Sequence, residues 1–301
     1  MKFSKMHGIG NDYVVLDGRA DGRDWSALAR AMCDRHYGVG SDGLLVVAAS
    51  ERADLRFRMF NPDGSESEMC GNGIRCFAKY VYDKGIARTR ELRVETGNGV
   101  LELALDAPNG MVERVTVAMG VPEFRPERIP VAVQGERAFD VPVEGLTVSC
   151  VSMGNPHAVA FLDTPVASFP LDQVGPRVEH HAIFPRRVNF EVVNVKGRGE
   201  LDVRVWERGA GITLACGTGA CGVVAVARAK GLVDERVRVN MPGGPLEVAW
   251  DGAGDVMMTG PATLVFEGEW VERPSAIGRE RSAVSQQRAE LASSAGAGAD
   301  S

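Results

Sequence analysis

The sequence predicts an α+β fold of two pseudo-symmetric halves, each a β-sheet or barrel wrapped around a central helix. The main observation is a repeat, because Cys70-Gly71-Asn72-Gly73 returns 146 residues later as Cys216-Gly217-Thr218-Gly219. Further pairs recur in the same order at nearly the same offset: Gly10-Asn11 with Gly154-Asn155, Leu16-Asp17 with Leu162-Asp163, and Lys84-Gly85 with Lys230-Gly231. A second observation is that β-rich runs precede each motif and a helical pattern follows it.

The expected division of the chain follows from the repeat. We expect an N-terminal half over residues 1–118, to which 261–273 return, and a C-terminal half over 119–260. Residues 274–301 are rich in Ala, Ser, Gly, Arg and Glu and contain no aromatic residue. Such a composition buries too little apolar surface to fold, so we predict a disordered tail.

The elements of the first half can be taken in chain order. Short β-rich runs predict strands over residues 12–16, 44–47 and 55–59, and two more over 91–96 and 100–105. After Cys70, the apolar residues Ile74, Phe77, Ala78 and Val81 have helical spacing. After Cys216, residues 220–229 are apolar on nearly every side, which is typical of a buried helix.

Composition limits the class of protein. The chain of 301 residues has a formal net charge of −6, which argues against a binder of nucleic acid or of a membrane surface. No apolar run approaches the roughly 18 residues of a transmembrane helix, and the first ten residues lack a signal core. We therefore expect a cytoplasmic protein. Its six cysteines are too few for a disulfide scaffold, so we expect thiols.

The two motif cysteines stand where a helix begins. The first turn of a helix has unpaired N–H groups and a partial positive charge, which favour a thiolate and are expected to lower the cysteine pKa. The neighbouring glycines let a carboxylate reach those N–H groups. If the halves face each other, one sulfur lies on each side of a substrate α-carbon. One can then remove a proton while the other returns one, which inverts the centre.

Other interpretations of the cysteines stay open at this point. A buried cysteine is usually a small inert hydrophobe, and we assign that role to Cys33, Cys76, Cys150 and Cys221. A thiol-rich or zinc-binding protein without catalytic activity is the alternative from another class. The spacings from Cys70 to Cys76 and from Cys216 to Cys221 are not those of zinc pairs, so we expect no metal site.

Several short segments, in order, resemble those of the diaminopimelate epimerase family across roughly residues 1–270. The segments are 5–12 (KMHGIGND), 60–65 (FNPDGS), 69–76 (MCGNGIRC), 153–157 (MGNPH), 187–190 (RVNF), 207–211 (ERGAG) and 215–220 (ACGTGA). The resemblance implies interconversion of LL- and meso-2,6-diaminopimelate without pyridoxal phosphate, metal or other cofactor. It also implies a step of lysine biosynthesis and of peptidoglycan precursor supply.

The resemblance also implies roles for individual residues. In the LL-to-meso direction, Cys70 is the proton donor and Cys216 the proton acceptor, while His157 and Glu207 assist catalysis. The positions implied to bind the amino-acid substrate are Asn11, Asn61, Gly71, Asn72, Asn155, Asn189, Glu207, Arg208, Gly217 and Thr218. Amides can serve either ammonium or carboxylate, Arg208 can hold a carboxylate in a fork, and Glu207 can accept from an ammonium.

The chain departs from the family pattern at two places. Gly43 stands where many members have Gln, so one side-chain contact to the substrate is in doubt. Phe266 stands where members often have a Tyr linked to dimer contacts, and the implied homodimer loses one hydroxyl there. The nearest alternative of the same chemistry is a proline racemase or hydroxyproline epimerase, which also use paired cysteines. The segment 207–211 and the set of asparagines favour diaminopimelate.

Overall fold

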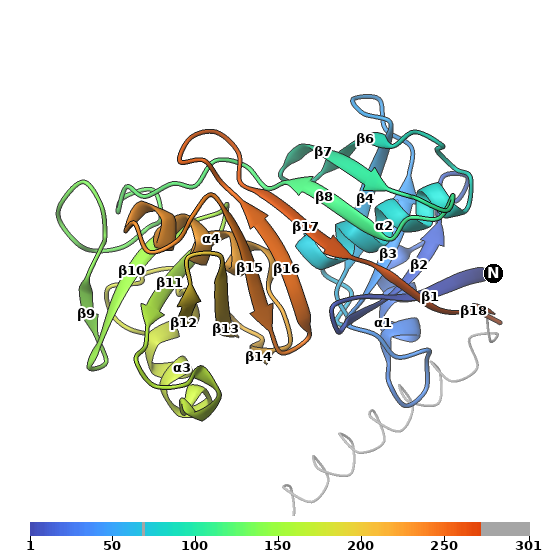
Figure 1. Cartoon of the computed structure of the whole chain (residues 1–301). Coiled ribbons are helices and arrows are strands. Elements are labelled where there is room, and N and C mark those ends of the chain that lie inside the picture. The colour runs from blue at the N-terminus through green and yellow to red at the C-terminus, as the bar shows by residue number, and fades with distance from the viewer. Residues whose placement is uncertain (68–69, 272–301) are drawn as a thin grey trace, which may run out of the picture. The chain divides into compact units, whose positions relative to one another are not determined.

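The structure is a computed structural model that describes residues 1–67 and 70–271 (Figure 1). Phe3–Glu267 form one compact unit, and among the described residues Met1–Lys2 belong with Gly268–Val271 to another. The fold below is that of the Phe3–Glu267 unit. Among the described residues, no helix has both the length and the apolar character needed to cross a membrane. The predicted tail over 274–301 lies outside the described residues.

The strands of the first half pair in an alternating pattern. β1 and β2 are antiparallel, β2 and β3 parallel, β3 and β4 antiparallel, and β4 and β6 parallel, after which β6, β7 and β8 are antiparallel neighbours. The strands are β1 (Lys2–Gly8), β2 (Asn11–Asp17), β3 (Gly43–Ala48), β4 (Leu55–Phe60), β5 (Glu66–Ser67), β6 (Glu91–Thr96), β7 (Gly99–Asp106) and β8 (Arg114–Ala118). All five strands predicted for this half are present.

The second half repeats this order of pairings. From β10 to β17, the pairs are antiparallel, parallel, antiparallel and parallel, and then twice antiparallel. The strands are β9 (Val141–Val143), β10 (Leu146–Ser152), β11 (Pro156–Phe161), β12 (Asn189–Gly197), β13 (Glu200–Glu207), β14 (Gly211–Thr213), β15 (Arg236–Met241), β16 (Gly244–Ala249) and β17 (Met257–Pro261). The repeated connectivity confirms the predicted duplicated fold, whereas the residue numbers at which the halves divide stay a prediction.

One strand pair joins the two halves. β17 is antiparallel to β16 on one side and to β8 on the other. The hydroxyls of Thr116 and Thr259 are 2.8 Å apart across the pair β8–β17. After β17, the chain continues into β18 (Thr263–Glu269), which pairs with β1.

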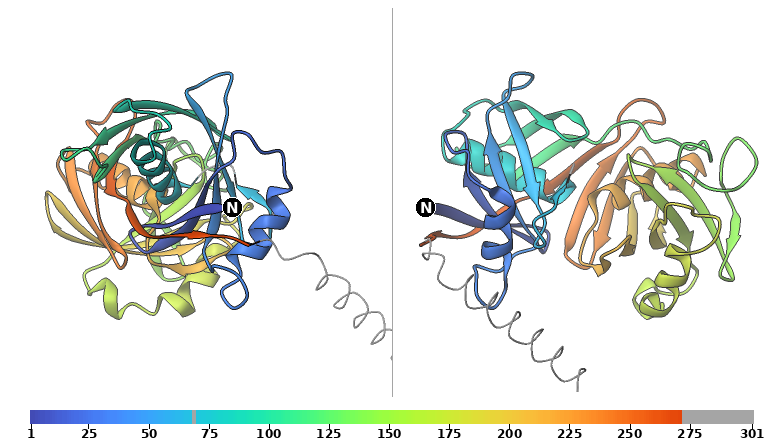
Figure 2. Two further views of the ribbon diagram at one scale, coloured as in Figure 1. Left: turned by 90° about the vertical axis from the view of Figure 1, so that its right-hand side faces the viewer. Right: turned by 180° about the vertical axis from the view of Figure 1, so that it is seen from behind.

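The two motif helices lie in the core, as their apolar patterns predict. α2 (Gly71–Asp83) is buried continuously from Gly71 to Val81, and in α4 (Gly217–Ala229) the residues from Gly219 to Ala227 are all buried. The strands of the first half curve around α2, which is seen in the left view of Figure 2. Cys33, Cys76, Cys150 and Cys221 are buried, as expected of core cysteines.

Two further helices were not expected from the sequence. α1 (Trp25–Cys33) lies between β2 and β3, and α3 (Leu171–Glu179) lies at the equivalent place between β11 and β12. α3 forms although Gly175 and Pro176 both disfavour a helix interior. A Cβ at Gly175 would lie 2.5 Å from the Trp206 ring, so the glycine is required by close packing.

Candidate functional site

Cys70 and Cys216 occupy the same structural position in the two halves. Cys70 is the N-cap of α2 and Cys216 is the N-cap of α4, and both have extended backbone angles. The N–H of Gly73 donates to Cys70 Sγ and the N–H of Gly219 to Cys216 Sγ, each at 3.4 Å. Each thiol therefore accepts the bond that a Ser or Asp side chain usually accepts at an N-cap.

The first turns of α2 and α4 touch each other. A Cβ added to Gly71 would lie 3.3 Å from the Cα of Gly217, and one added to Gly217 would lie 3.3 Å from the Cα of Gly71. Real Cβ contacts are rarely so short, so a side chain at either position would push the helix starts apart. The glycine after each cysteine is required by this approach.

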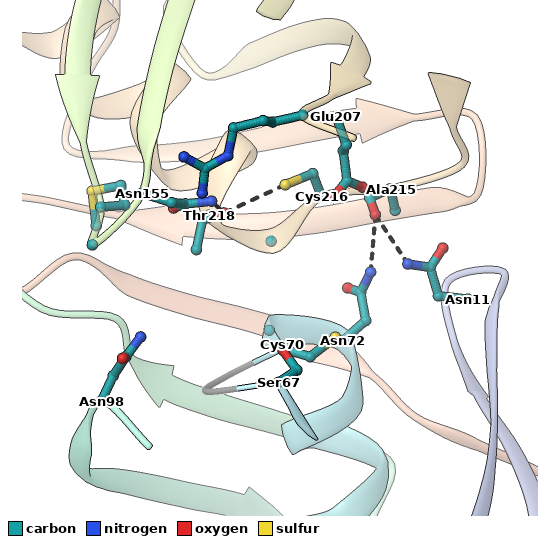
Figure 3. A pocket seen from close by; sticks show the side chains of 15 residues that line it. Asn11, Ser67, Cys70, Asn72, Asn98, Asn155, Glu207, Ala215, Cys216 and Thr218 are labelled. Atoms are coloured by element: carbon teal, nitrogen blue, oxygen red, sulfur yellow. Dashed lines mark hydrogen bonds between the residues drawn. The ribbon is translucent and has the colours of Figure 1, made fainter. Parts of the chain in front are cut away.

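Both cysteines line one cavity of about 290 Å³ (Figure 3). The cavity is lined by Asn11, Ser67, Cys70, Gly71, Asn72, Asn98, Met153, Gly154, Asn155, Glu207, Arg208, Ala215, Cys216, Gly217 and Thr218. A second cavity of about 1310 Å³ shares Asn11, Cys70, Glu207 and Arg208 with the first and extends to Asn61. The structure thus places most of the predicted site residues around one space.

Amides from the first half bind the backbone of the second. Asn72 Nδ2 and Asn11 Nδ2 donate to the carbonyl of Ala215, at 3.0 and 3.3 Å, immediately before Cys216 (Figure 3). Arg75, which is fully buried on α2, donates to Asn72 Oδ1 at 3.0 Å and to the carbonyl of Pro261 at 3.2 Å. This chain of bonds orients Asn72 toward the second cysteine.

A chain of hydrogen bonds leads from Cys216 into the core. Thr218 Oγ1 lies 3.4 Å from Cys216 Sγ and accepts from Asn155 Nδ2 at 3.2 Å. Asn155 Oδ1 lies 3.0 Å from His157 Nε2, and His157 Nδ1 lies 2.7 Å from Glu191 Oε1. Because an amide oxygen only accepts, His157 Nε2 carries a proton. His157 and Glu191 are fully buried.

Glu207 and Arg208 lie at the end of β13, beside the cavity. The Thr213 hydroxyl donates to Glu207 Oε1. The exposed Arg208 donates from its backbone N–H to Asn189 Oδ1 at 2.9 Å and from Nη1 to the carbonyl of Arg186 at 3.1 Å. Within the described part of the chain, its guanidinium forms no salt bridge. The charged guanidinium of Arg208, beside the cavity, is thus available to bind a carboxylate through two N–H groups.

Three predicted residues stand apart from the smaller cavity. Asn61 lines only the larger one, and its Nδ2 donates to Ser65 Oγ at 2.9 Å. His157 and Asn189 line neither of the two cavities. Asn189 is buried, and its Nδ2 donates to the carbonyl of Pro156 at 2.8 Å. His157 and Asn189 contact residues that do line the cavity, which are Asn155 and Arg208.

The expectation that the two thiols have a lowered pKa is wrong. Burial raises the pKa of Cys70, although bonds from the Tyr13 hydroxyl and the N–H groups of Gly73 and Asn72 lower it in part. Burial, followed by the charges of Glu207 and Glu191, raises the pKa of Cys216 well above its ordinary value. The loss of solvation therefore outweighs the helix terminus at both sulfurs.

Glu207 has a perturbed pKa as well. Burial raises the pKa of its carboxyl, although hydrogen bonds with Thr213 and Cys216 lower it in part. A buried carboxyl beside a buried thiol is a candidate pair for proton exchange, because neighbouring ionisable groups with perturbed pKa values gather at functional sites. Among the described residues, no three or more His, Cys, Asp or Glu gather as metal ligands would.

Two residues of the site escaped the sequence analysis. The Tyr13 hydroxyl lies 3.1 Å from Cys70 Sγ, and Glu191 pairs with His157. Each lies two positions after a predicted asparagine on the same strand, Tyr13 after Asn11 and Glu191 after Asn189. Side chains two apart on a strand share a face, so this period was the signal that could have found them.

The chain is similar to proteins of known function over most of its length. A sequence model of the family described as diaminopimelate epimerase matches residues 3–125 and 149–265. A diaminopimelate epimerase of Acetivibrio thermocellus is 48% identical over 275 residues, which cover 89% of this chain and 98% of the relative. One of Moorella thermoacetica is 49% identical over 277 residues, which cover 90% and 99%.

Solved structures share the fold. A probable proline racemase from Agrobacterium radiobacter K84 matches with a TM-score of 0.67 and 17% identity, over 91% of this chain and 94% of that chain. At that identity, the likeness shows a common architecture of two halves and nothing about the substrate.

Proposed function

Because the chain belongs to the diaminopimelate epimerase family, we propose that Cys70 and Cys216 are the acid and base with which it acts on its substrate. The enzyme is an isomerase that interconverts LL- and meso-2,6-diaminopimelate, a reaction of lysine biosynthesis. The observation that carries the proposal is the position of the two thiols, which cap two touching helices and line one cavity.

The proton transfers follow from this placement. In the LL-to-meso direction, the thiolate of Cys216 takes the α-proton and becomes a thiol, which leaves a carbanion next to the substrate carboxylate. The thiol of Cys70 then gives its proton to the opposite face and becomes a thiolate. The roles are reversed in the other direction. N–H groups in the first turns of α2 and α4, which have no partner within the helix, stabilise the charge that grows on the carboxylate.

Glu207 is the base that converts the Cys216 thiol to its thiolate. Since burial raises the pKa of Cys216, few molecules carry the thiolate at neutral pH. In our proposal, Glu207 takes the proton of Cys216, so the pair holds one proton and one negative charge until the thiolate accepts the α-proton of the substrate. The raised pKa of the Glu207 carboxyl makes it a better acceptor than an exposed glutamate.

The polar groups around the cavity hold the ends of the substrate. We assign one carboxylate to the N–H groups at Gly71–Asn72 and Gly217–Thr218, and the distal carboxylate to Arg208. Asn11, Asn61 and Asn155 take the remaining ammonium and carboxylate groups. Asn189 acts on the backbone of Arg208, and His157 orients Asn155. No pyridoxal phosphate or metal takes part, so we expect full activity in the presence of a chelator.

Assembly and location are part of the same proposal. We infer a homodimer in the cytoplasm. The support for the dimer is the exposed apolar row Leu264, Val265 and Phe266 on β18. The Phe266 ring lies 6.0 Å from that of Phe3, which holds the row in place.

Deuterium exchange tests the proposed chemistry. In D₂O, the wild-type enzyme should convert LL-diaminopimelate to the meso form with deuterium at the inverted α-carbon. Cys70→Ala and Cys216→Ala should each lose at least about 10³-fold in kcat/KM for epimerisation, because each removes one of the two proton carriers. Cys33→Ala, which changes a buried cysteine away from the cavity, should remain within a few-fold of wild type.

Two outcomes would contradict the proposal. Full epimerisation by both cysteine variants would exclude the two-thiol mechanism. Turnover of proline with no turnover of diaminopimelate would assign the site to the other group of epimerases with this fold.

A further inference from the structure

Tyr13 lies against the first catalytic sulfur, and the proposed mechanism gives its side chain no role. We propose that the Tyr13 hydroxyl is a catalytic hydrogen-bond donor to the Cys70 thiolate and the counterpart, in the first half, of His157. The inference rests on the proposed function, because it assigns a partner to one of the two thiols.

The contact is direct and enclosed. Tyr13 Oη and Cys70 Sγ are 3.1 Å apart, and Tyr13 is only 1% exposed. Tyr13 lies on β2 opposite Gly43 of β3. A Cβ at Gly43 would lie 3.0 Å from Met59 Cε and 3.6 Å from Tyr13 Cδ1, so the tyrosine ring and Met59 occupy the space beside this glycine. The hydroxyl is held in one place.

The duplication gives this contact an equivalent in the other half. Asn11 recurs as Asn155, and Tyr13 two residues later corresponds to His157. The strand registers agree, because Tyr13 is opposite Gly43 and Val15 opposite Leu45, whereas His157 is opposite Asn189 and Val159 opposite Glu191. Leu45 thus corresponds to Glu191.

The two thiols consequently have different partners. On the side of Cys70, the equivalent strand positions hold a neutral phenol and an apolar leucine. On the side of Cys216, they hold a histidine and a carboxylate that pair with each other. The phenol contacts its sulfur directly, whereas the histidine is connected to Cys216 through Asn155 and Thr218.

The surroundings keep the phenol in its donor form. Burial raises the pKa of Tyr13 well above its ordinary value, so its proton stays on oxygen wherever the enzyme works. The titratable and charged groups around the pair come from three sides, with Asp42 ahead of β3, Arg75 and Cys76 on α2, and Glu207 at the end of β13. None of these four side chains has a hydrogen bond to Cys70 Sγ among the described contacts, whereas the Tyr13 hydroxyl does.

The donor acts in both directions of the reaction. When Cys70 gives its proton to the carbanion, the S–H bond breaks and the new thiolate accepts the O–H of Tyr13. In reverse, this thiolate takes the α-proton while the phenol keeps its own. A hydrogen bond to a charged sulfur stabilises the thiolate more than the thiol. It therefore lowers the pKa of Cys70.

The test measures the thiolate of Cys70 directly. The full-length protein is alkylated with iodoacetamide between pH 6 and 11. The rate of alkylation of Cys70 is followed by mass spectrometry of the peptide that contains it. Tyr13→Phe should raise the midpoint of this curve by about one pH unit and lower kcat/KM at neutral pH about tenfold. Tyr80→Phe is the matched control, since Tyr80 is a second buried tyrosine, on the helix that Cys70 caps, and should leave both unchanged.

A second variant acts in the opposite direction. Replacing Tyr13 alone by 3-fluorotyrosine makes the phenol a stronger donor, and the midpoint for Cys70 should fall. Equal midpoints for wild type, Tyr13→Phe and the fluorinated protein would overturn the inference even if diaminopimelate is epimerised normally. Absence of epimerisation by the wild type would refute the proposed function instead. A shift of the Cys70 alkylation midpoint in the Tyr13 variants would even then support the hydrogen bond from Tyr13 to Cys70.

Discussion

At the scale of single residues, the chemistry of the site depends on how far its ionisable groups are buried. Burial raises the pKa of Cys70, Cys216 and Glu207 together. Each group is then uncharged more often than in water, so the anionic form of either thiol depends on the groups that contact it. The low polarity around buried groups also strengthens the bonds from helix N–H groups to a developing anion.

Glu191 offers a test of this electrostatic balance. Burial is the main reason for the high pKa of Cys216, and the charges of Glu207 and Glu191 raise it further. Glu191→Gln removes a negative charge, so the pKa of Cys216 should fall. The acidic limb of the kcat/KM profile should then move to lower pH by roughly 0.5–1 unit.

The matched variant for this position comes from the other half. Glu191→Leu copies the equivalent Leu45 and leaves His157 Nδ1 without its buried partner. It should reduce the free energy of unfolding by about 1–3 kcal/mol, measured by urea denaturation, whereas Glu191→Gln should cost less. An acidic limb that stays in place for Glu191→Gln would contradict the effect of this carboxylate on the pKa of Cys216.

At the scale of elements, the site is formed by two helix starts that meet without side chains between them. Gly71 and Gly217 permit the contact, and the amides of Asn11 and Asn72 bind the carbonyl that precedes the second cysteine. The distance between the thiols is therefore set by backbone contacts of α2 and α4. Rigid elements hold such geometry better than loops do.

Gly71→Ala tests the importance of this contact. The new Cβ would lie 3.3 Å from Gly217 Cα, so the helix starts must separate by a few tenths of an ångström. We expect kcat to fall about tenfold or more, because proton transfer is sensitive to small displacements of the reacting groups. Gly22→Ala is the control, since a Cβ there meets nothing within 4 Å. Unchanged kinetics for Gly71→Ala would show that the helix starts can separate freely.

At the scale of the whole molecule, a single connectivity is used twice and joined through β17. The order of parallel and antiparallel pairs from β1 to β8 is the order from β10 to β17, and β8 pairs with β17. An ancestral half would present only one thiol to a substrate. In the proposed mechanism, two halves place one thiol on each side of the α-carbon, which is what inversion of a centre requires.

The proposed dimer is tested at this scale. Phe266 is 46% exposed beside the exposed Leu264 and Val265. Phe266→Asp places a charge in this apolar row, so it should convert the dimer to a monomer in light scattering at micromolar concentration. Arg238→Asp, which alters the charge at an exposed position of β15, should not change the mass. A wild-type monomer would contradict the dimer.

The sequence by itself determined the duplicated architecture, the five strands predicted in the first half and the two buried motif helices. It also placed both cysteines at helix starts. These features can be predicted from local sequence patterns, because helical spacing and repeated motifs are defined by residues close together in the sequence. α3 could not be found in this way, because Gly175 and Pro176 oppose a helix locally and only packing against Trp206 explains the glycine.

Only the tertiary structure decided the electrostatics of the site. The pattern at Cys70 and Cys216 predicts thiols with a lowered pKa, yet burial raises both. Desolvation depends on everything packed around a group, and most of that comes from distant parts of the chain. The partners Tyr13 and Glu191 have the same origin. A hydrogen bond between residues 57 positions apart, as from Tyr13 to Cys70, exists only once β2 packs against α2.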